Sequence, residues 1–206
     1  MSKLRIALAL VTSLVVSGAI IALVLAPSSG GARARSPRVG SVLGLSPVSA
    51  PGRDGSTAQF AFLARQTSNR CGLQPSELNQ MPSRMRLQGS CCFPMNLAAY
   101  QAQVRRLRAY RGVPTIPRDP YDVPVSLAKR LLAYDHTIHL SPAHARTYSH
   151  AMHMSRLKGP CCCPCWRWYA FRGLSKHLIA DLGWQAARIA TLTELLEGCG
   201  GPADHA

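Results

Sequence analysis

The feature that most constrains this chain is a short turn that holds half of its eight cysteines. Cys161, Cys162, Cys163 and Cys165 lie in the stretch Gly-Pro-Cys-Cys-Cys-Pro-Cys-Trp. Adjacent cysteines do not easily bond to each other, because a disulfide needs a specific separation of its two Cα atoms. The three consecutive thiols therefore need partners from elsewhere in the chain, and the fold has to bring those partners to this turn.

The turn lies where one helical pattern stops and another begins. Gly159-Pro160 ends the first pattern, and Pro164 suits the first turn of a predicted helix over 164–180. Unpaired backbone N–H groups at a helix start favour negative charge and lower the pKa of a nearby thiol. Arg167 acts in the same direction. We therefore expect reactive or metal-binding thiols here.

Cys162 and Cys165 form a C-x-x-C pair, a spacing that serves two chemistries. It can chelate a soft metal, or it can exchange thiols and disulfides, with Cys162 as nucleophile and Cys165 as the resolving thiol. A third interpretation is a group of disulfides that clamps loops to the helix. A c-type haem site is excluded, because it needs histidine after the second cysteine and Trp166 stands there.

A second cysteine turn resembles the first. Gly-Ser-Cys-Cys-Phe-Pro contains Cys91 and Cys92, again with glycine before, proline after and a predicted helix following. If the two turns meet, six cysteines share one site. Cys199 has glycine on both sides, which allows the backbone to fold back toward another sulfur, so we expect it to form a disulfide whose partner the sequence does not identify.

A histidine- and methionine-rich helix precedes the first turn. Within the predicted helix 142–157, His150, His153 and Met154 stand at i, i+3 and i+4 and share one face. Imidazole and thioether groups are copper ligands, so these residues are candidate auxiliaries to the cysteines. The alternative is that the methionines pack in the core while the histidines lie at its rim.

The N-terminal region predicts a membrane anchor. Residues 6–26 carry no charge, and 21 uncharged, mostly apolar residues are enough to span a bilayer as a helix. Residues 1–5 form a short basic cytoplasmic tail, so we predict a single-pass signal anchor with the main domain on the extracytoplasmic side. Residues 27–56 read as a Pro/Ser/Gly-rich linker, 57–201 as the cysteine-rich domain and 202–206 as a tail.

The net charge of +15 comes from 24 Lys and Arg against 9 Asp and Glu. Such a balance suggests nucleic acid as a partner, but the charges are spread along the chain. Anionic lipid headgroups beside the predicted anchor are the more economical partner, and nucleic acid binding is not expected. A protein partner and an oligomeric state are not indicated.

The fold class expected for the domain is all-α, a small cysteine-rich helical bundle behind the membrane helix and linker. Apolar residues recur at helical spacing, and Gly and Pro separate the segments. The predicted helices cover 97–111, 123–135, 142–157, 164–180 and 184–197, with one short helix inside 57–70.

The leading functional hypothesis is a membrane-anchored domain that binds copper or zinc and stores, delivers or senses it. Nucleophile-elbow, zincin, P-loop and Rossmann motifs are absent from the sequence, so no enzyme activity is indicated. The alternatives are a thiol–disulfide redox protein and a disulfide-stapled interaction domain. The candidate metal ligands are Cys161, Cys162, Cys163, Cys165, Cys91, Cys92, His150, His153 and Met154.

Overall fold

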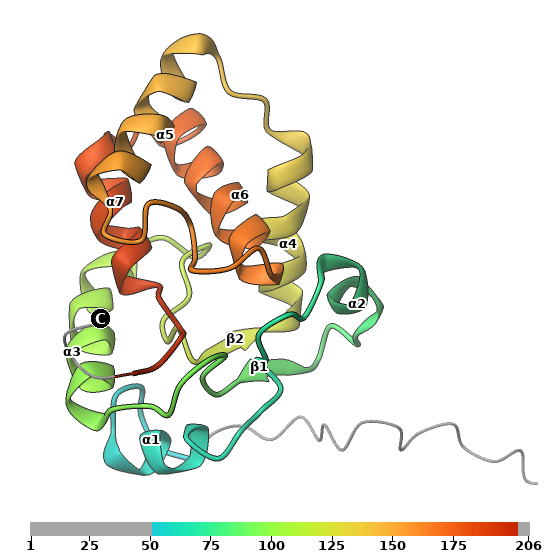
Figure 1. The fold of residues 1–206 in the computed structure, drawn as a ribbon, viewed down its shortest axis with the longest axis vertical. Helices are drawn as coiled ribbons and strands as arrows, with labels where there is room; N and C mark the ends of the chain where they lie inside the picture. Colours follow the sequence, from blue (N-terminus) through green and yellow to red (C-terminus); the bar gives the residue numbers. More distant parts are fainter. Residues whose placement is uncertain (1–50, 202–206) are drawn as a thin grey trace, which may run out of the picture. The chain divides into compact units, whose positions relative to one another are not determined.

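The computed structural model describes residues 51–201, which form seven α-helices, one 3-10 helix and a small sheet (Figure 1). The helices are α1 (Thr57–Leu63), α2 (Pro75–Gln80), α3 (Leu97–Leu107), α4 (Val125–Thr137), α5 (Pro142–Met154), α6 (Trp166–Ala180) and α7 (Ala186–Leu195). The 3-10 helix is Arg108–Tyr110, and the strands are β1 (Arg86–Gln88) and β2 (Asp122–Pro124). The predominance of helix confirms the predicted class.

The helix boundaries beside the cysteine turn differ from the predicted ones. α6 begins at Trp166 rather than 164, because Cys165 is extended, with φ −95° and ψ −174°, and serves as the N-cap. α5 ends at Met154 rather than 157, because Ser155 leaves the helical region with ψ 139°. Residues 155–165 therefore form one long connection, which gives the cysteines more room than a tight turn between two helices would.

The two-stranded sheet is a departure from a purely helical fold. β1 and β2 run antiparallel, with Leu87 paired to Val123. Arg86 Nε donates to Asp122 Oδ1 at 2.6 Å across the pair. Each strand has three residues, too few for an alternating pattern to be recognised in the sequence.

The main core packs α6 between α4 and α7. Buried aliphatic side chains from all three helices meet there, among them Leu131, Leu174, Leu178, Ile189 and Leu192. Two salt bridges reinforce the α4–α6 pair, since Arg172 and Lys176 both reach the buried carboxylate of Asp135. α6 is therefore the rigid element onto which the cysteine turn is attached.

A second, smaller core joins α1 and α3 through Leu63, Tyr100, Val104 and Tyr121. Tyr100 donates to the buried carboxylate of Asp119 at 2.7 Å. The segment after α7 runs alongside α3 toward the C-terminus (Figure 1). This return path places Cys199 between the helices of the main core and those of the smaller one.

Several predicted segments lie outside the described residues: the tail 1–5, the anchor 6–26, the linker up to residue 50 and the tail 202–206. Between residues 51 and 201, no helix combines the length and the apolar character needed to cross a bilayer.

Candidate metal centre

Four segments that are distant in the sequence meet around the eight cysteines. Backbone hydrogen bonds hold them in register: Cys71 N–H donates to Cys91 O at 3.1 Å, and Cys91 N–H donates to Gly198 O at 3.0 Å. Phe93 N–H then donates to Cys199 O at 2.7 Å. Cys71, the Cys91–Cys92 turn and Cys199 are thus placed by the main chain and not only by their side chains.

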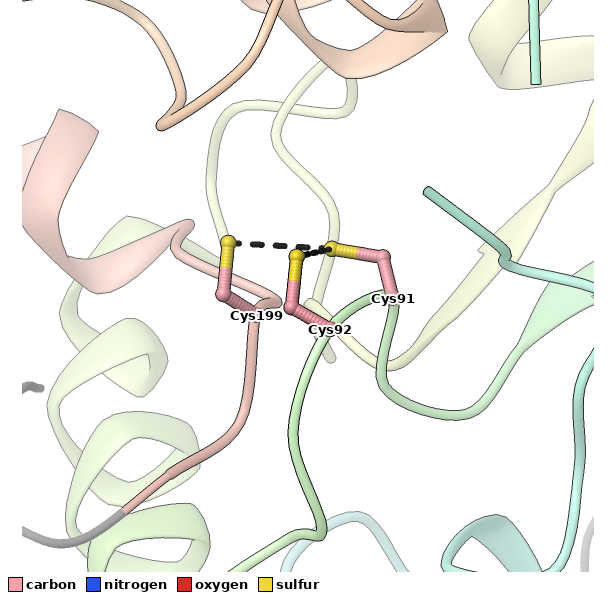
Figure 2. Close-up of side chains that lie close together, drawn as sticks. All are labelled: Cys91, Cys92 and Cys199. Atoms are coloured by element: carbon pink, nitrogen blue, oxygen red, sulfur yellow. Dashed lines mark hydrogen bonds between the residues drawn. The ribbon is translucent and has the colours of Figure 1, made fainter. Parts of the chain in front are cut away.

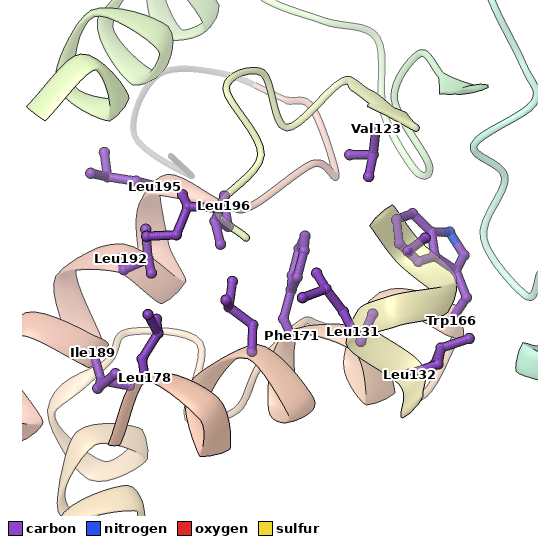
Figure 3. Packing of buried hydrophobic residues seen from close by; sticks show 14 of the residues in the cluster. Val123, Leu131, Leu132, Trp166, Phe171, Leu178, Ile189, Leu192, Leu195 and Leu196 are labelled. Carbon is purple, nitrogen blue, oxygen red and sulfur yellow. The ribbon is translucent and has the colours of Figure 1, made fainter. Parts of the chain in front are cut away.

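The first cysteine turn joins this assembly through the start of α6. Trp166 N–H donates to Leu73 O at 2.8 Å, which ties the residue after Cys165 to the segment after Cys71. Trp166 and Phe171 of α6 pack among Leu131, Leu132 and Val123 (Figure 3). The buried rings fix the position of Cys165 relative to α4 and β2.

Glycine allows the segment that follows α7 to approach the Cys91–Cys92 turn closely. Gly200 has φ +73°, a region that side-chain-bearing residues rarely adopt. A Cβ at this position would also overlap the carbonyl oxygen of Phe93. The Gly-Cys-Gly-Gly sequence therefore lets Cys199 lie directly against the Cys91–Cys92 turn.

The sulfur atoms form a continuous network. Figure 2 shows Cys91, Cys92 and Cys199 with their sulfurs turned toward one another, 3.5 Å from Cys91 to Cys92 and 3.6 Å from Cys91 to Cys199. Cys199 Sγ also lies 2.9 Å from Cys162 Sγ, and Cys92 Sγ lies 4.0 Å from Cys162 Sγ. The network therefore links the two cysteine turns, as the sequence predicts if they meet in space.

Three groups of cysteines have the spacing of metal ligands, with all sulfurs of a group within 4.8 Å of one another. The groups are Cys91, Cys92 and Cys199; Cys161, Cys162 and Cys199; and Cys161, Cys163 and Cys165. Cys71, outside all three, lies 3.4 Å from Cys163, sulfur to sulfur. These groups could hold a metal ion. All six cysteines predicted as ligands belong to them.

The network is buried on one side and open on the other. Cys161, Cys165 and Cys199 are buried, whereas Cys71, Cys92 and Cys162 are exposed. Trp168 packs against the cluster and covers part of it. Solvent and small ions can therefore reach one face of the network while its interior sulfurs are shielded.

A buried cation lies beside the sulfurs. The side chain of Arg167 is completely buried and donates to Leu196 O at 3.1 Å and to Pro120 O. No carboxylate within residues 51–201 forms an ion pair with it. A buried charge needs compensation, and the thiols of Cys91 and Cys161 lie within electrostatic reach of this guanidinium.

Two cysteines, Cys91 and Cys161, have a lowered pKa in this network. A hydrogen bond from Cys199 lowers the pKa of Cys91 to about 6, against the effect of burial and with help from the Arg167 charge. Hydrogen bonds from Cys165 and Cys199 lower the pKa of Cys161, and Arg167 again contributes. Cys91 and Cys161 are therefore the thiols that deprotonate first, and both are predicted ligands.

The two thiols of the predicted redox pair, Cys162 and Cys165, fall in different sulfur groups. Burial raises the pKa of Cys162, and the hydrogen bond with Cys161 together with burial raises that of Cys165. A nucleophilic thiol needs the opposite shift, so this geometry does not favour Cys162 as a nucleophile.

The disulfide expected for Cys199 is not formed in this structure. All eight cysteines lie within the described residues, and all eight are free thiols. The closest pair, Cys162 and Cys199, is separated by 2.9 Å, whereas a disulfide bond is about 2.05 Å long. The glycines do bring Cys199 back to other sulfurs, but to several of them at once.

The predicted auxiliary ligands are not brought to the sulfurs. His150 and His153 are exposed on α5, and within residues 51–201 no histidine belongs to a candidate metal group. Met154 is 48% exposed, whereas Met152 packs in the core. Residues 155–160 separate the end of α5 from the first cysteine of the turn, so helical periodicity alone could not place these side chains.

Sequence reasoning missed two members of the network and one neighbour. Cys71 and Cys199 were not among the expected ligands, although flanking glycines mark both. Glu197 is nearly buried, and its Oε2 has no hydrogen-bond partner among the described residues. Burial raises the pKa of Glu197 to about 7, and the charges of Cys161 and Cys91 add to this.

Comparisons of the chain with protein-family models, with curated proteins and with solved structures found no match. The chemistry of the site is therefore argued from its own sulfurs.

Proposed function

We propose that this protein is a membrane-anchored, extracytoplasmic domain that binds a soft metal ion, copper or zinc, through its clustered cysteines. The observation that carries the proposal is the meeting of both cysteine turns with Cys199 in groups of ligand spacing. Thiolate is the ligand that soft metals such as Cu(I) and Zn²⁺ prefer. Storage, delivery or sensing of the ion fits a site with exposed thiols at one face.

The buried charge of Arg167 supports an anionic centre. Thiolates beside it provide the compensation that the described carboxylates do not. Metal binding requires deprotonated thiols, and the same guanidinium favours deprotonation of Cys91 and Cys161. The position of Arg167 beside the thiols therefore serves two purposes: the thiolates compensate its buried charge, and its charge favours the deprotonated thiols that metal binding requires.

Substitution of either end of the C-x-x-C pair is expected to weaken metal binding. Loss of an outer partner of a metal ligand already weakens affinity by about 10–100-fold, so Cys162→Ser and Cys165→Ser should each cost at least about 10-fold. The measurement is the metal affinity of the full chain, purified under reducing conditions. His150→Ala is the matched control, because His150 is exposed and outside the sulfur groups. Unchanged affinity in both serine variants contradicts the proposal.

The anchoring part of the proposal rests on the uncharged run 6–26. The full chain is expected in the membrane fraction and to resist extraction at high pH, whereas a chain lacking residues 6–26 is expected to be released. Protease added from outside should reach residues 57–201 in the full chain. Recovery of the intact full chain in the soluble fraction contradicts the anchor.

The short distance between Cys162 and Cys199 favours a second candidate, a domain stapled by disulfides. Molecular oxygen or a disulfide would accept two electrons from the two thiols, which release their protons as the S–S bond forms. Intact mass separates the candidates, because each disulfide lowers the mass by about two units and a bound ion raises it. Full oxidation of the native protein without a metal adduct favours the stapled domain.

A further inference from the structure

The three sulfur groups are not separate sites, because two cysteines each belong to two of the groups. Cys199 belongs both to the group with Cys91 and Cys92 and to the group with Cys161 and Cys162. Cys161 in turn belongs to the second group and to the group with Cys163 and Cys165. Ions in all three groups would therefore be joined by common sulfurs.

We propose that the protein holds three Cu(I) ions in one cluster, with Cys199 and Cys161 as bridging thiolates. This inference rests on the proposed function and specifies its ion and its stoichiometry. A structural zinc ion takes four ligands, whereas each group provides three sulfurs. Cu(I) is a soft monovalent ion that two or three thiolates satisfy.

The distances agree with three-coordinate ions. With a metal–sulfur distance of about 2.3 Å, three sulfurs in a plane around one ion lie about 4 Å apart. Within the group of Cys91, Cys92 and Cys199, the separations of 3.5 Å from Cys91 to Cys92 and 3.6 Å from Cys91 to Cys199 are close to this value. The sulfurs of Cys162 and Cys199, at 2.9 Å, would move apart when an ion enters.

Both bridging sulfurs are buried, whereas the terminal ones range from buried to exposed. Cys199 and Cys161 are each 3% exposed, while Cys92 and Cys162, each in a single group, are exposed; Cys165 and Cys91 are buried terminal sulfurs. A sulfur that binds two cations carries less uncompensated charge than one that binds a single cation. Since burial of uncompensated charge is costly, the sulfurs shared by two groups are expected to be buried.

The charge balance also fits. Each thiol that binds copper gives up its proton to solvent, and the thiolates then outnumber the positive charges of three monovalent ions. The cluster is anionic, and the buried guanidinium of Arg167 lies within electrostatic reach of Cys161 and Cys91. The exposure of Cys92 and Cys162 leaves the remaining charge in contact with water.

The test counts copper on the full chain. Cu(I) is supplied as its acetonitrile complex without oxygen, a competing chelator removes weakly held copper, and native mass spectrometry counts the ions. The wild type is expected to hold three. Cys199→Ser should retain one, because it damages two groups, and Cys163→Ser should retain two. Cys71→Ser is the matched control, since Cys71 lies outside the groups, and it should retain three.

The outcomes separate this inference from the proposed function. One or two ions on the wild type overturn the three-ion cluster and leave the proposed function standing. No bound copper overturns the cluster, and no bound copper together with no zinc adduct in a parallel titration overturns both. Loss of a single ion in Cys199→Ser overturns the bridging role. If circular dichroism shows that this variant does not fold, X-ray absorption of the loaded wild type decides: a short copper–copper distance is expected, and its absence overturns the cluster.

Discussion

Trp166→Ala is expected to lower the free energy of unfolding by about 4 kcal/mol, as for other large aromatic residues removed from a core. The indole is fully buried at the start of α6 and lies edge-on to Phe171. Its Nε1 donates to Asn69 Oδ1 at 3.2 Å. Denaturant unfolding of the reduced, metal-free chain measures the loss.

Two further variants make this result specific. Trp166→Phe keeps most of the ring volume and loses the hydrogen bond, so a smaller loss of about 1–2 kcal/mol is expected. Leu182→Ala alters a side chain that is 48% exposed and should change stability by less than about 0.5 kcal/mol. A loss below about 1 kcal/mol in Trp166→Ala contradicts the packing of this ring.

Gly173→Ala is expected to cost about 3 kcal/mol, because α4 and α6 cannot remain at their present separation. A Cβ on Gly173 would overlap the carbonyl oxygen of Leu131 and lie 2.6 Å from the backbone nitrogen of Asp135. Both are main-chain atoms of α4, so rotation of a side chain does not relieve the overlap. Thermal and denaturant unfolding measure the cost.

Gly112→Ala is the matched control for this substitution. Gly112 has no atom within 4 Å of the Cβ position. Its φ also lies outside the region that favours glycine, so alanine should be neutral or slightly stabilising, within about 1 kcal/mol. Equal stabilities for Gly173→Ala and Gly112→Ala would show that the two helices tolerate a wider separation.

The helices were predictable because their signals are local. Asn96 accepts a hydrogen bond from Ala99 N–H, as expected for the N-cap of α3, and Ser141 caps α5 in the same way. Helix ends were less predictable near the cysteines, where Cys165 and Ser155 adopt extended conformations. These conformations depend on the cluster as a whole and leave no periodic signal in the sequence.

The type of residue in the site could be predicted from the sequence, but the full set of cysteines that form it could not. The two cysteine turns indicated thiol chemistry, and the structure brings both together. The inclusion of Cys71 and Cys199 depends on main-chain pairing with Cys91, which has no sequence pattern. The converse holds for His150, His153 and Met154. Their shared helix face indicated a pocket, but whether that face is turned toward the cysteines depends on the tertiary fold.

The spread of the sulfurs along the chain has a consequence for biosynthesis. The network uses cysteines from residue 71 to residue 199. During translation, the residues of helices α1 to α6 are all added to the chain before Cys199. The full set of sulfurs can meet only after residue 199 has been synthesised. A polypeptide truncated before Cys199 therefore contains these helical segments but an incomplete set of thiols.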